Sequence, residues 1–143
     1  MLTRLFAPGA TTMATSLGLL VLRLWLGMMM LTFHGWVKVV NFGNLSARFA
    51  DPYGFGRPLS LALSIVAELI CAALIAAGLA TRLAALVLIT NMTTAFVFAH
   101  GMKLSGPGNG ELAFIYLAGF VAILLAGPGR YSMDQSLFGR RGR

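Results

Sequence analysis

Four long runs of apolar residues dominate this 143-residue sequence and constrain its fold more than any other feature. The runs cover residues 16–40, 58–80, 83–99 and 111–126. Each approaches the roughly 20 residues that cross the hydrocarbon core of a bilayer. Their apolar residues are continuous rather than alternating, which favours helices over strands. The sequence therefore predicts an all-α fold, an integral membrane four-helix bundle.

The content of charged residues is too low for a soluble domain. Only 10% of the residues are charged and 58% are hydrophobic, whereas soluble domains have about 25% and 45–50%. The single cysteine, Cys71, has no partner in the chain, which excludes a disulfide-stabilised secreted fold. We expect one membrane domain over residues 1–143 that ends in a short basic tail.

The net charge of +7 comes from basic residues that are scattered singly between the apolar runs, apart from the tail Arg140-Arg141-Gly142-Arg143. Proteins that bind nucleic acid cluster Lys and Arg on one exposed face. Scattered bases in short loops instead fit contact with anionic lipid head groups. The lipid bilayer is therefore the expected partner, and nucleic acid is not.

The loops also predict an orientation in the membrane. No signal-peptide cleavage site follows the N-terminus, so the first run is expected to stay as an anchor. More Lys and Arg residues flank one side of the membrane than the other, and the more basic side faces the cytoplasm. Both termini are therefore expected in the cytoplasm. The bases on that side are Arg4, Arg82, Arg130, Arg140, Arg141 and Arg143, against Lys38, Arg48, Arg57 and Lys103 outside.

Charged residues inside the runs mark a functional site or a buried partner, because a lone charge in hydrocarbon is costly. Arg23 and His34 share one face of the first helix with Lys38 at its edge, and Glu68 lies in the second run. Because Arg23 and Glu68 differ in expected depth by only about 7 Å, we predict that they pair. The pair is either a structural ion pair or the organiser of a polar pocket.

Asn91 is the polar residue of the third run with the greatest need for a partner, since its amide must be hydrogen-bonded in hydrocarbon. A hydrogen bond to a neighbouring helix is the first expectation. Contact with a ligand is the alternative.

Further titratable residues are expected at the outward helix ends, namely His34, Lys38, His100, Lys103 and Glu111. Such a cluster can bind an anionic or quinol head group or pass protons. The alternative is a set of interfacial charges solvated by water and lipid. Two histidines also raise the idea of a bis-histidine haem, but no residue spacing indicates a metal site.

Several short motifs, taken together, resemble the DoxX family of membrane proteins. Arg23-Leu24-Trp25-Leu26-Gly27, Phe33-His34-Gly35 and Lys38 are similar to the family's first helix. Glu68, Gly78 and Thr81-Arg82-Leu83-Ala84-Ala85 resemble its second helix and turn. Gly110-Glu111-Leu112 and residues 127–134 resemble its fourth helix and exit. The resemblance covers about residues 17–137.

This resemblance implies a bacterial or archaeal inner-membrane protein that is linked to redox chemistry. Relatives are described as subunits of a terminal quinol oxidase and of a thiosulfate:quinone oxidoreductase. A quinone or quinol is the implied ligand, and no covalently bound cofactor is expected. The candidate pocket residues are Arg23, His34, Lys38, Glu68, Asn91, His100 and Glu111.

Two functions remain open from the sequence. The first is a small membrane subunit of a quinone-linked oxidoreductase, which binds a quinol or lipid-like ligand within the helices and belongs to a larger membrane complex. The alternative is a non-catalytic structural or assembly subunit that packs against such a complex. A transporter is disfavoured, since no run is clearly interrupted.

Overall fold

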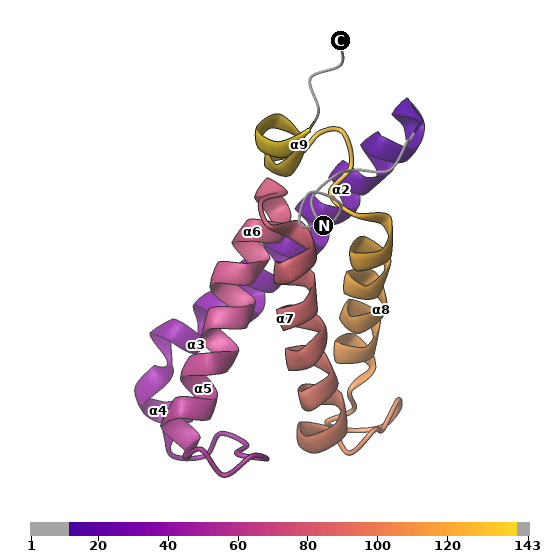
Figure 1. The fold of residues 1–143 in the computed structure, drawn as a ribbon. Coiled ribbons are helices and arrows are strands. Elements are labelled where there is room, and N and C mark those ends of the chain that lie inside the picture. The colour runs from indigo at the N-terminus through magenta and orange to yellow at the C-terminus, as the bar shows by residue number, and fades with distance from the viewer. Residues whose placement is uncertain (1–11, 140–143) are drawn as a thin grey trace.

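The computed structural model describes residues 12–139, and every regular element in that range is helical (Figure 1). Arg4 and the basic tail from residue 140 lie outside the described residues. The first long helix joins α2 (Met13–Met30), the π-helical turn η1 (Leu31–Gly35) and α3 (Trp36–Val40). The short helix α4 (Phe42–Ser46) follows it.

The second long helix joins α5 (Arg57–Ile65), the π-helical turn η2 (Val66–Cys71) and α6 (Ala72–Ala77). Helix α7 (Thr81–Thr94) continues into a third π-helical turn, η3 (Ala95–Ala99). Helix α8 (Glu111–Ala126) and the short α9 (Met133–Phe138) complete the described chain.

Three of these helices are long and apolar enough to cross a membrane. They are Met13–Val40, Arg57–Ala77 and Thr81–Ala99, while Glu111–Ala126 is a shorter apolar helix. Large apolar side chains such as Trp25, Phe33 and Leu125 are exposed on the outside. In water such a surface would be unfavourable, and in a bilayer it faces lipid. The protein is therefore a helical membrane protein.

Local sequence signals account for most helix ends. Thr12 caps α2 by accepting a hydrogen bond from the backbone N–H of Thr15 at 3.2 Å. Pro58 occupies the first turn of α5, where a missing N–H costs little. Gly78 ends α6 in the left-handed conformation (φ +70°), and the Asn109 side chain accepts from the N–H of Glu111 at 3.1 Å where α8 begins.

The helices pack in pairs: α2 against α6, η1 against η2, and α7 against α8. Small residues set the closest approach between the first two long helices. A Cβ on Gly27 would lie 2.8 Å from the carbonyl oxygen of Ala72, and a Cβ on Gly35 would lie 2.6 Å from that of Glu68. Close contact of backbones through small residues is typical of membrane helices. Fully buried apolar residues fill the rest, among them Met30, Ile75, Leu88, Phe120 and Ile123.

The chain after α8 crosses the N-terminal half of α2 and folds back over the adjoining ends of α6 and α7 (Figure 1). Asp134 accepts hydrogen bonds from the N–H groups of Ala80 at 2.7 Å and Thr81 at 2.9 Å, and so caps α7. The Arg23 guanidinium donates to the carbonyl oxygens of Tyr131 and, at 3.4 Å, of Ile75. This C-terminal segment therefore ties α2 to the turn between α6 and α7.

Candidate functional site

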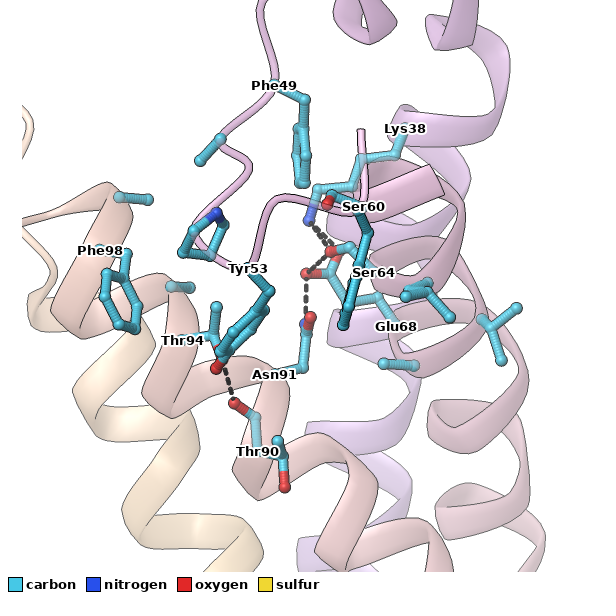
Figure 2. A pocket seen from close by; sticks show the side chains of 18 of the residues that line it. Lys38, Phe49, Tyr53, Ser60, Ser64, Glu68, Thr90, Asn91, Thr94 and Phe98 are labelled. Carbon is cyan, nitrogen blue, oxygen red and sulfur yellow. Dashed lines mark hydrogen bonds and ion pairs between the residues drawn. The ribbon is translucent and has the colours of Figure 1, made fainter. Parts of the chain in front are cut away.

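The main polar site of the described helices is centred on the carboxylate of Glu68. This residue is 2% exposed and forms an ion pair with the ammonium group of Lys38. Its other oxygen accepts from the Asn91 amide at 2.9 Å and from the Ser64 hydroxyl at 3.2 Å. Figure 2 shows Lys38 and Asn91 pointing at the carboxylate from opposite sides. One buried charge thus connects α3, α5 and α7 through η2.

Two π-helical turns bring these side chains together. Glu68 lies in η2 and His34 in η1, and the two turns pack against each other. A π-helical turn holds one extra residue and changes the direction of the side chains that follow it, and such turns are frequent at functional sites. Lys38 follows η1 by one turn of helix and lies 3.2 Å from the Ser64 hydroxyl as well.

The predicted pairing of Arg23 with Glu68 is wrong. Arg23 is fully buried, but it does not contact Glu68. It binds the carbonyl oxygen of Ile75, near the C-terminal end of the second long helix, and that of Tyr131, in the segment before α9. The contact of Gly35 with Glu68 sets the register between the two helices. Arg23 lies twelve residues before Gly35, which corresponds to about 18 Å along the helix. Arg23 and Glu68 are therefore further apart in depth than the sequence suggested. Lys38, instead of Arg23, forms the ion pair with Glu68.

A cavity of about 900 Å³ opens between the second and third long helices, with the Lys38–Glu68 pair at its polar end. Its walls are mainly apolar and aromatic and include Phe49, Tyr53 and Phe98 (Figure 2). Pockets of roughly 300–1,000 Å³ with apolar walls and a few placed polar groups hold small molecules. The cavity therefore has the size and chemistry of a ligand site.

Residues 47–56, here named the cover loop, pass over this cavity (Figure 2). The Tyr53 hydroxyl lies 2.9 Å from that of Thr94 and joins the loop to α7. Asp51 accepts hydrogen bonds from the Ser60 hydroxyl at 2.7 Å and from the N–H groups of Phe55 and Gly56. These bonds, that from Ser60 foremost, hold the pKa of Asp51 below its ordinary value.

A second, smaller cavity of about 110 Å³ lies beside the first and shares Lys38, Glu68, Ala95 and His100 with it. Its remaining lining includes His34 and Tyr116, whose rings meet edge to face with centroids 5.5 Å apart. This volume is below the range of small-molecule pockets.

The structure gathers most of the candidate residues but not all. Lys38, Glu68, Asn91 and His100 line the large cavity, and His34 lines the small one. Glu111, at the start of α8, is exposed and lines neither cavity. Lys103 is likewise exposed and lines neither cavity. Glu68 is therefore the acid that lines one cavity together with both histidines.

Several site residues carried a weak signal or none in the sequence. Ser64 precedes Glu68 by four residues, so helical periodicity alone places it on the same face. Tyr53 and Tyr116 reach the site through the path of the cover loop and through the packing of α8, which no local pattern reveals. Among residues 12–139, no group of three or more His, Cys, Asp or Glu side chains is arranged to bind a metal ion.

Comparison with known proteins supports the family resemblance. The family model named DoxX matches residues 18–101. An uncharacterized protein of Haemophilus influenzae is 30% identical over 117 residues, which cover 76% of this chain and 83% of that protein. No solved structure matches the chain.

Proposed function

The chain belongs to the DoxX family, and from this premise we propose that it is a small membrane subunit of a quinone-linked oxidoreductase. It binds a quinol, or a ligand of similar lipid-like chemistry, within a bundle of four membrane helices. Its partner is a larger membrane complex that supplies the electron donor or acceptor.

The observation that supports this function best is the large cavity with one polar end. A quinol combines an apolar chain with hydroxyl groups that need hydrogen-bond partners. The apolar and aromatic walls suit the chain and ring, and the Lys38–Glu68–Asn91 cluster offers a donor and acceptors to the head group. Because Lys38 and Glu68 neutralise each other, this cluster suits an uncharged polar head group.

The proposed bundle takes α8 as its fourth span. Its 16 residues measure about 24 Å, and a bilayer adapts to a short span by local thinning. Helix α8 packs along α7 and α2, and exposed apolar residues such as Ile115 and Leu125 point away from the core. Lipid or a partner subunit can cover these side chains.

We place the protein in a bacterial or archaeal inner membrane with both termini in the cytoplasm. The balance of Lys and Arg between the loops supports this orientation. The cover loop and the large cavity then lie toward the outer leaflet. The C-terminal segment that Arg23 and Asp134 hold then lies at the cytoplasmic side.

Blocking the large cavity tests the proposed function. Thr90 lines the cavity, whereas Thr93 is exposed on the same helix and lines neither cavity. Thr90→Trp places an indole in the cavity, and Thr93→Trp is the matched control. Each purified variant is titrated with a short-chain benzoquinone in lipid nanodiscs by isothermal calorimetry.

We expect Thr90→Trp to lose about tenfold or more in affinity, a free-energy change of about 1.4 kcal/mol or larger. Thr93→Trp should bind like the parent protein. Absence of quinone binding by the parent, or equal binding by both variants, would favour the structural subunit instead.

A further inference from the structure

The small cavity adjoins the large one at Lys38, Glu68, Ala95 and His100, which line both. Both cavities are lined by the same two charged side chains. Glu68 accepts from Lys38, Ser64 and Asn91 on the side of the large cavity (Figure 2). The ion pair therefore lies at the boundary of two cavities of very different size, about 900 and about 110 Å³.

The chemistry of the small cavity favours water. Its volume of about 110 Å³ exceeds the ~10–15 Å³ of cavity space that one water molecule needs. Water is stable inside a protein where it finds two to four polar partners, and empty cavities are apolar. Five polar side chains line this cavity, and they are His34, Lys38, Glu68, His100 and Tyr116.

His100 lines both cavities and also reaches the loop before α8. It ends the third long helix, is half-buried, and places Nδ1 2.9 Å from the carbonyl oxygen of Gly108 in the loop before α8. A carbonyl oxygen only accepts, so Nδ1 carries the proton and donates it. In the neutral ring Nε2 is then free to accept a hydrogen bond from water.

We propose that the small cavity is an internal water site, filled from the loop at residues 100–110 and not through the large cavity. Water bound there gives Glu68 contact with exchangeable protons while a ligand occupies the large cavity. The existence of the water site is independent of the proposed quinone binding, and only its use during ligand binding rests on that function.

Radiolytic labelling tests this inference, because hydroxyl radicals made from bound water modify the side chains beside it. Met92 and Tyr116 line the small cavity, although they are only 4% and 7% exposed. Met30 and Phe120 are matched controls, being fully buried and outside both cavities. We expect Met92 to be modified several-fold faster than Met30, and Tyr116 several-fold faster than Phe120.

Substitutions at Ala113 test the water site, and a substitution at Thr90 tests the route of the water. Ala113 lines only the small cavity, so Ala113→Leu should displace the water and reduce the labelling of Met92 to the rate of Met30. Ala113→Val fills less space and serves if the leucine variant does not fold. Thr90→Trp blocks the large cavity. If the water does not enter through that cavity, this variant should leave unchanged the uptake of ¹⁸O by Met92 from rapidly mixed H₂¹⁸O.

Labelling of Met92 and Tyr116 at the rates of their controls in the parent protein would overturn the water site. Loss of ¹⁸O uptake in Thr90→Trp would overturn the proposed route. Neither result depends on quinone binding, so failure of the proposed function is recognised separately, by the calorimetric titration.

Discussion

Glu68 is the residue on which the site depends, because its carboxylate is buried and binds side chains from three helices. A buried charge is tolerated only when it is paired and hydrogen-bonded. Lys38 supplies the opposite charge, and Ser64 and Asn91 supply the further hydrogen bonds. The same arrangement that stabilises the charge also forms the polar end of the large cavity.

Removal of this carboxylate should therefore destabilise the protein strongly. In Glu68→Ala, Lys38 loses its partner, and the expected loss is about 3–5 kcal/mol in the free energy of unfolding. Glu68→Gln keeps an acceptor for Asn91 and should lose less. Unfolding in mixed detergent micelles measures the stability of both variants. The control is Glu111→Ala at an exposed position, which should change stability by no more than about 1 kcal/mol. Equal stability of Glu68→Ala and the parent would contradict the buried pair.

The cover loop should open as the pH falls, because Asp51 holds it together. Its pKa is lowered in the folded protein, chiefly by the hydrogen bond from Ser60. A group with a lowered folded pKa contributes stability above its ordinary pKa, and this contribution is lost as the pH falls through the folded value. A spin label at Phe55→Cys, in a Cys71→Ala background, should gain mobility below about pH 4. In Asp51→Asn the label should be mobile at every pH, and a pH-dependent label there would contradict this role.

For single residues, the sequence was most informative where the side chain itself requires a polar partner. Glu68 and Asn91 were recognisable because a polar group in hydrocarbon needs a partner, and the structure places them 2.9 Å apart. The identity of the partner was not recognisable for Arg23. It depends on how far one helix is shifted along another, which the sequence of neither helix contains.

The long helices form the next level, and their apolar runs predicted them well. The run at 111–126 coincides with α8, and the first helix begins at Met13, three residues before its run. The π-helical turns at Leu31–Gly35, Val66–Cys71 and Ala95–Ala99 were not predicted. They depend on contacts between helices, as in the packing of η1 against η2. No characteristic amino-acid composition marks such turns in the sequence.

The close packing of η1 on η2 predicts that Gly35 cannot carry a side chain. A Cβ there would lie 2.6 Å from the carbonyl oxygen of Glu68, and a backbone atom cannot move aside as a side chain does. Gly35→Ala should therefore destabilise the protein by about 1–3 kcal/mol through overpacking. In Gly18→Ala nothing lies within 4 Å of the new Cβ, so this helical control should be neutral or up to about 1 kcal/mol more stable. Equal unfolding curves for the two variants would show that the two helices do not pack so closely.

For the whole molecule, the proposed orientation places the cover loop outside the cell and both ends of the chain inside. In intact cells, Arg48→Cys in the cover loop should react with a thiol reagent that does not cross membranes. Arg130→Cys, an exposed position after α8, should react only after the cells are opened. Both variants are made in a Cys71→Ala background. The reverse pattern would place the large cavity at the cytoplasmic leaflet.

The C-terminal segment shows what the sequence could not reveal about the whole molecule. Asp134 caps α7 across more than fifty residues of chain, and the carbonyl oxygen of Tyr131 binds Arg23 across more than one hundred. Neither contact follows from a local pattern, although the apolar run at 111–126 predicted the end of α8. The segment packs at one end of the bundle, and the large cavity lies toward the opposite end of the same helices.

Photoaffinity labelling with a diazirine-bearing benzoquinone tests the central claim most directly, because it identifies where the ligand binds. In nanodiscs, we expect adducts on cavity-lining residues such as Tyr53, Leu63 and Phe98, and excess unmodified quinone should suppress them. Adducts on the exposed residues Val21, Trp25 and Leu125 should be few and insensitive to competition. If the adducts lie only on those exposed residues, and competition has no effect, the cavity is not a quinone site.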